Sequence, residues 1–139
     1  MLDSEAVLNS LDFPTVVDEM EEMHRQPEGL VDELLMESSD QTANVNHFFI
    51  RAGWQPEEAV GAKVITIFPR NNQKKTWPSI QAVYILFEGK NGTPVACLDG
   101  TALTYLKTAA DSALGAKLLA RKTMQNMLMI GAGEMAVHL

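Results

Sequence analysis

The 139-residue sequence has too little of several features on which common protein classes depend. Its one cysteine, Cys97, cannot form an internal disulfide, and no Cys/His spacing predicts a zinc site. Its longest apolar runs, such as 82–87, are far shorter than the roughly 20 residues of a bilayer span, and no signal-peptide pattern opens the chain. These absences predict a cytoplasmic globular protein without a metal or a membrane anchor, in which Cys97 is a small core residue.

Positive charge is also scarce, because 18 Asp and Glu outnumber 11 Lys and Arg and leave a net charge of −7. This balance argues against binding to nucleic acid or to anionic membranes, which both need a surplus of basic residues. The charge is unevenly distributed, with 12 acidic residues and one arginine in residues 1–40 but 6 acidic and 10 basic residues in 41–139. We expect an acidic, solvated helix surface in the first segment, and a second segment that attracts an anion such as a carboxylate or a phosphate.

Hydrophobic periodicity predicts helices at both ends of the chain and strands between them. Helical spacing and capping signals predict short helices over 4–11 and 14–24. Residues 30–36 are ambiguous between helix and strand, and 38–46 are predicted to form a loop. Four runs rich in β-branched and aromatic residues predict strands, over 47–54, 62–68, 80–87 and 93–98.

The end of this strand region and the following segment suggest the fold class. Asn91-Gly92 predicts an antiparallel hairpin between the last two strands. Residues 101–121 predict a long helix in which alanines and Gly115 would allow another backbone to approach closely. Asp99 is expected to cap this helix or to form a turn. We therefore predict an α/β chain, α+β-like at its N-terminus, with a mixed, mostly antiparallel sheet and flanking helices.

A glycine motif follows a short apolar run near the end of the chain. Gly131, Gly133 and Ala136 match G-x-G-x-x-G/A directly after residues 127–130, which are predicted to form a strand. In a dinucleotide-binding fold this turn leads into a helix whose N-terminus holds a pyrophosphate; the alternative is a glycine-rich turn without a ligand. Leu139 falls inside the expected helix, so we expect the chain to be the front part of a longer polypeptide.

Several blocks, taken together in their order and spacing, resemble the ornithine cyclodeaminase/mu-crystallin family. The resemblance is carried by the glycine motif and by residues 61–69, 78–82, 92–96, 98–104 and 107–110. It implies that residues 1–112 form a substrate-binding and dimerisation domain. Residues 113–139 would be the end of a connecting helix and the truncated start of an NAD(P)-binding Rossmann domain.

The resemblance also implies an activity. Such an enzyme transfers hydride to or from a small amino or imino acid with NAD or NADP, which this chain does not distinguish. The reaction is either the lyase conversion of ornithine to proline with loss of ammonia, or the reduction of an imino acid by an oxidoreductase. The expected assembly is a homodimer, and the 139-residue chain alone is expected to be inactive. The alternatives are a mu-crystallin-like binding protein without turnover and an inactive, self-associating fragment.

Site residues follow from the same resemblance. Lys63 matches the family lysine that binds the substrate carboxylate and assists proton movement; a lysine in an apolar strand is also costly unless an anion faces it or its ammonium reaches water. Lys107 stands where the family has arginine and would contact both substrate and cofactor. Arg51 would substitute for a second family arginine, with a solvent-facing arginine as the ordinary alternative. Gln81 is the further substrate-binding candidate, with polar alternation in a strand as its ordinary explanation. The remaining cofactor-binding candidates are Ser79, Thr108, Gly131, Gly133, Glu134 and Met135, the last in place of a family glutamine.

Overall fold

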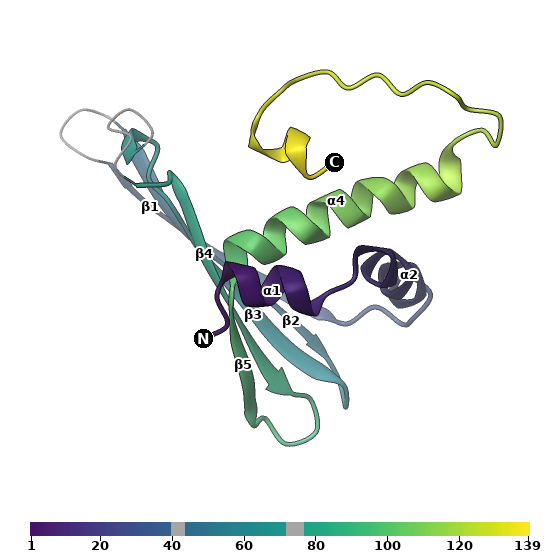
Figure 1. The fold of residues 1–139 in the computed structure, drawn as a ribbon. Helices are drawn as coiled ribbons and strands as arrows, with labels where there is room; N and C mark the ends of the chain where they lie inside the picture. The colour runs from purple at the N-terminus through teal and green to yellow at the C-terminus, as the bar shows by residue number, and fades with distance from the viewer. Residues whose placement is uncertain (40–43, 72–76) are drawn as a thin grey trace.

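The computed structural model describes residues 1–39, 44–71 and 77–139, and these form a five-stranded antiparallel sheet with helices (Figure 1). The strand order is that of the sequence, β1-β2-β3-β4-β5. The strands are β1 (Leu30–Ser39), β2 (Val45–Gln55), β3 (Ala59–Ile67), β4 (Ile80–Glu88) and β5 (Pro94–Asp99). The helices are α1 (Ser4–Ser10), α2 (Phe13–Met23), α4 (Gly100–Leu119) and the 3-10 helix η1 (Glu134–Val137).

Most of the predicted elements are confirmed. The four predicted strands and the long helix are present, and the ambiguous segment 30–36 is part of β1. The loop predicted over 38–46 is shorter, because β1 continues through Ser39 and β2 begins at Val45; residues 40–43 lie outside the described part. Every pair of neighbouring strands is antiparallel, and the parallel contact in the described chain is an isolated bridge between Leu2 and Leu98.

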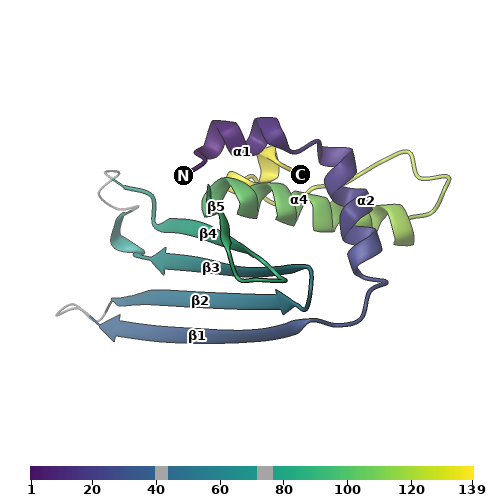
Figure 2. The same ribbon diagram turned by 90° about the horizontal axis from the view of Figure 1, so that it is seen from below.

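The helices lie on one side of the sheet and leave the other side uncovered (Figure 1). Figure 2 shows them gathered near β4 and β5, so that β1 and β2 extend away from them. The uncovered face carries an apolar row, because the register aligns Leu34, Ile50, Val64 and Val83 across four strands on that face. None of the helices in the described ranges combines the length and apolar character that crossing a membrane requires.

The start of α4 is fixed by a cap and by close contact with β4. Asp99 is the N-cap residue, and its Oδ1 accepts hydrogen bonds from the backbone N–H groups of Thr101 and Ala102, both at 2.9 Å. Gly100 is buried, and its backbone lies so close to β4 that a Cβ atom there would be 2.9 Å from atoms of Ala82 and Val83. These two residues hold the first turns of α4 against the sheet.

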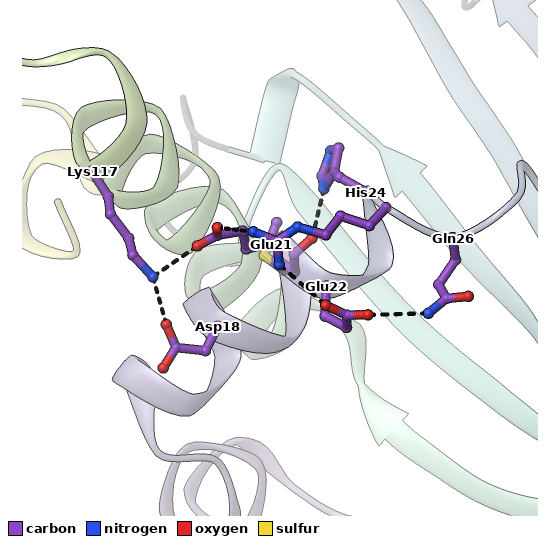
Figure 3. Close-up of polar contacts among 8 residues, drawn as sticks. Asp18, Glu21, Glu22, His24, Gln26 and Lys117 are labelled. Atoms are coloured by element: carbon purple, nitrogen blue, oxygen red, sulfur yellow. Dashed lines mark hydrogen bonds and ion pairs between the residues drawn. The ribbon is translucent and has the colours of Figure 1, made fainter.

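The other end of α4 packs against α2. Val17, Ala110 and Leu114 form a buried apolar cluster between the two helices. At its edge, Lys117 donates to Asp18 at 2.7 Å and forms an ion pair with Glu21 at 2.8 Å (Figure 3). Lys117 lowers the pKa of Glu21, chiefly through that hydrogen-bonded contact. Lys117 and Asp18 are solvent-exposed, so we expect the apolar cluster to contribute more than their ion pair to holding α2 on α4.

The strand predicted over 127–130 and the helix predicted after it are not formed. Residues 127–130 have no regular secondary structure, and four residues of η1 stand where the helix was expected. Leu128 and Ile130 are 84% and 92% exposed. A strand is stabilised by hydrogen bonds to a neighbouring strand and by burial of its side chains, and this segment has neither in the described chain. The apolar run was therefore not sufficient to predict a strand.

Candidate functional site

A pocket of about 280 Å³ lies between the sheet and the first half of α4. Strands β1 to β4 supply its floor and α4 supplies its roof. Its lining residues are Val31, Arg51, Ala52, Gly53, Gly61, Lys63, Tyr84, Leu103, Thr104, Lys107 and Thr108. Three of them are cationic and none is acidic, so the pocket suits an anion.

The register of the sheet places the cationic residues together. Arg51 and Lys63 are directly paired across β2 and β3, and Lys63 is paired with Tyr84 of β4, so all three lie on the face that α4 covers. On α4, the lining residues Thr104, Lys107 and Thr108 recur at the three- and four-residue spacing of one helix face. Residues from β2, β3, β4 and α4 therefore converge on one space. Of the predicted site residues, Arg51, Lys63, Lys107 and Thr108 are brought together here.

The electrostatics of the pocket centre on Lys63. Partial burial lowers the pKa of the Lys63 ammonium, and the positive charges of Lys107 and Arg51 lower it further. Lys107 forms an ion pair with Asp111 one helical turn away. Within the described ranges, no ion pair joins Lys63 or Arg51 to a carboxylate, although Glu33 is the cross-strand neighbour of Arg51. A bound carboxylate would reduce the repulsion among Arg51, Lys63 and Lys107, which is the physical reason to expect a carboxylate ligand in this pocket.

Tyr84 and Gly61 are among the lining residues that were not predicted from the sequence. The Tyr84 ring extends along the sheet over Gly61, and a Cβ atom at position 61 would lie 1.9 Å from the Tyr84 hydroxyl oxygen. Burial raises the pKa of Tyr84, so the phenol stays protonated and can donate a hydrogen bond. The only signal for this pair in the sequence was the strand alternation, which becomes informative once the register with Lys63 is known.

Ser79 and Gln81 do not reach this pocket. Gln81 is paired with Thr66 on the uncovered face of the sheet, opposite the face that carries Lys63 and Tyr84. Positions 81 and 84 are an odd number of residues apart on one strand, so their side chains point to opposite faces. Ser79 precedes β4, and its carbonyl accepts a hydrogen bond from the Phe68 N–H at 2.7 Å. The geometry therefore gives no support to a shared role with Lys63 for either residue.

The glycine segment lies against α4 at a different place. His138 stacks on Tyr105 of α4 with ring centroids 4.4 Å apart, which brings η1 back toward this helix (Figure 1). Gly131 has a positive φ of 111°, as expected for a glycine turn, and Gly133 precedes η1. The segment lacks the strand and the full helix that hold a pyrophosphate, so as it stands it does not fit a dinucleotide.

The convergence of Lys63 and Lys107 can be tested by titration. We expect Lys107→Met to raise the pKa of Lys63, because it removes a nearby positive charge and releases the carboxylate of Asp111. The Lys63 pKa should stay below its usual value, since burial, the largest cause of the lowering, is unchanged. NMR titration of the lysine side-chain signals measures this shift. Lys122→Met, at an exposed lysine, is the control that should leave Lys63 unchanged; an unaltered Lys63 in Lys107→Met would contradict the arrangement.

Comparison with known proteins finds that this chain is similar to reductases and to a dehydrogenase. A curated relative, the Delta(1)-pyrroline-2-carboxylate reductase of Colwellia psychrerythraea, is 31% identical over 140 residues, covering 100% of this chain and 44% of the reductase. The structure of Thermococcus litoralis Delta(1)-pyrroline-2-carboxylate reductase with NADH and L-proline is 27% identical, with a TM-score of 0.69 over 87% of this chain and 38% of that one. An archaeal alanine dehydrogenase dimer with bound NAD has a TM-score of 0.81 at 24% identity, over 99% of this chain and 42% of that one. The chain thus spans less than half the length of these relatives.

The family assignment rests on a match along nearly the whole sequence. The model of the ornithine cyclodeaminase/mu-crystallin family matches residues 10–138. The α/β architecture agrees with that of the two solved structures. The resemblance inferred from the sequence blocks is confirmed, and the chain belongs to the ornithine cyclodeaminase/mu-crystallin family.

Proposed function

We propose that this protein is an NAD(P)-dependent enzyme that reduces a small imino acid, in the class of pyrroline-2-carboxylate, to the amino acid. The observation that carries the proposal is the convergence of Arg51, Lys63 and Lys107 on one pocket without an acidic lining residue. Such a pocket favours a carboxylate and offers no partner to the distal ammonium of ornithine. The similarity to two pyrroline-2-carboxylate reductases supports reduction over cyclodeamination as the reaction.

The cationic lining residues would have different roles in binding the substrate. Lys63 and Arg51 would bind the substrate carboxylate, Arg51 through two parallel N–H donors and Lys63 as a point charge. Lys107 would add its charge from α4, with a looser grip than an arginine in the same place because it lacks the planar fork. Burial, together with the charges of Lys107 and Arg51, lowers the pKa of Lys63, which would favour proton release from its Nζ.

Support for a nicotinamide cofactor comes from similar proteins, because residues 131–135 of this chain do not form a dinucleotide-binding site as they stand. NAD and NADH are bound in two of the similar structures. A bound nicotinamide would supply the hydride. Of the residues predicted to bind the cofactor, Lys107 and Thr108 line the pocket, whereas residues 131–135 do not form a phosphate-binding turn as they stand. We propose that residues 1–112 bind the substrate and that residues 113–139 lead into the cofactor-binding part.

We also propose a homodimer that forms through the uncovered sheet face. Phe48 and Met36 on this face are 36% and 54% exposed, and a second copy would bury them. The similar alanine dehydrogenase structure is a dimer.

The test is an assay of protein expressed from the complete reading frame that encodes this chain. NADH or NADPH is mixed with pyrroline-2-carboxylate, or with pyruvate and ammonia, and the loss of reduced-nicotinamide absorbance is followed. We expect turnover of at least one imino acid, and sedimentation of the same sample should give a dimer. Absence of turnover together with saturable binding of NADH and proline would instead favour a mu-crystallin-like binding protein. The 139-residue chain alone is expected to be inactive.

A further inference from the structure

The cationic pocket has an apolar neighbour on the same side of the sheet. This second pocket, of about 260 Å³, is lined by Met23 and Trp54 among others. The two pockets share four lining residues, Val31, Gly53, Gly61 and Tyr84. Val31 has a small side chain and the two glycines have none, so the aromatic ring of Tyr84 is the largest group between the two spaces.

The position of the Tyr84 ring depends on the absence of a side chain at position 61. A Cβ atom there would lie 1.9 Å from the hydroxyl oxygen and 2.6 Å from Cζ of Tyr84, both far inside contact distance. The ring therefore occupies the space that a larger residue on β3 would fill. Its cross-strand pairing with Lys63 fixes the other end of the side chain beside the cations.

We propose that Tyr84 is a specificity-determining residue: its ring closes the cationic pocket toward the apolar one and so limits the substrate to a compact imino acid. This inference rests on the proposed function, because it assumes that the carboxylate lies at Lys63 and that the rest of the substrate points toward Tyr84. With the ring present, a five-membered ring fits on the cationic side. Without it, the two pockets join and a longer substrate can extend toward Met23.

The experiment compares kcat/KM for pyrroline-2-carboxylate with that for its six-membered homologue, piperideine-2-carboxylate. We expect Tyr84→Ala to shift the ratio toward the larger ring by about tenfold or more, since one methylene in an apolar pocket changes discrimination by roughly 10- to 200-fold. Tyr84→Phe is the matched control, because it keeps the ring and removes the hydroxyl, and its ratio should stay near that of the wild type. Gly61→Ala should push the ring toward the cations and weaken both substrates, the larger one more.

The outcomes separate this inference from the proposed function. A wild-type protein that reduces neither substrate overturns the proposed function and this inference with it. An active wild type with an unchanged ratio in a folded Tyr84→Ala protein overturns the inference alone. An equal shift in Tyr84→Phe would also overturn it, because the hydroxyl and not the ring would then set the preference. If Tyr84→Ala does not fold by circular dichroism, Tyr84→Leu provides the same comparison with a shorter apolar side chain.

Discussion

Replacing Lys63 with methionine is expected to raise the KM for the imino acid by about 30-fold or more, which is roughly 2 kcal/mol of binding free energy. Methionine matches the length of the lysine stem and removes the ammonium, so the packing of β3 is retained while the charge is lost. The remaining cations do not compensate, because Arg51 and Lys107 approach the pocket from other elements. The dissociation constant of NADH should change little, because in the proposed arrangement the charge that is removed would face the substrate.

The effect of Lys63→Met is assigned to the charge by two further variants. Lys63→Arg keeps the positive charge and should recover part of the affinity for the imino acid. The loss of this affinity at alkaline pH should shift to higher pH, because arginine does not deprotonate in that range. Lys122→Met removes an exposed lysine and should leave KM unchanged. NADH binding is followed by fluorescence and KM by steady-state kinetics. Equal weakening of substrate and cofactor by Lys63→Met would remove Lys63 from the role proposed for it.

The sequence predicted the elements that depend on local signals. The predictions of strands from β-branched runs, of a helix over 101–121 and of the Asp99 cap are confirmed. Each of these features depends on local signals in the sequence. Lys63 and Lys107 were also predicted, from the family resemblance, and the structure places both at one pocket. Their convergence depends on the packing of α4 on β3 and β4, which local signals do not determine.

Other predicted features lie elsewhere than expected where tertiary contacts decide the outcome. Gln81 lies on the opposite face from Lys63, which became clear only from the strand pairing. Residues 127–130 have the composition of a strand but no partner in the described chain. Gly115 was expected to allow a close backbone approach, yet a Cβ atom there would meet nothing within 4 Å. The close approach occurs instead at Gly100, where the helix meets the sheet.

Alanine substitutions at these two glycines of α4 should therefore have opposite effects on stability. Gly100→Ala is expected to lower the free energy of unfolding by about 1–3 kcal/mol, because the added methyl would lie 2.9 Å from atoms of Ala82 and Val83. The contacts include backbone carbons of β4, which cannot rotate away as a flexible side chain would. Gly115→Ala adds the same methyl in open space within a helix and should raise the free energy of unfolding by about 0.5–1 kcal/mol.

Gly100→Ala should also weaken the site, because relief of the clash moves the first turns of α4 away from β4. Thr104, Lys107 and Thr108 would move with the helix, and the carboxylate would lose the charge that approaches from above the sheet. Urea unfolding measures the stability of both variants, and the KM for the imino acid measures the displacement. Similar stability for the two variants would contradict the contact between Gly100 and β4. A destabilised Gly100→Ala protein with an unchanged KM would show that Lys107 contributes little to binding, since the helix that carries it would have moved without effect.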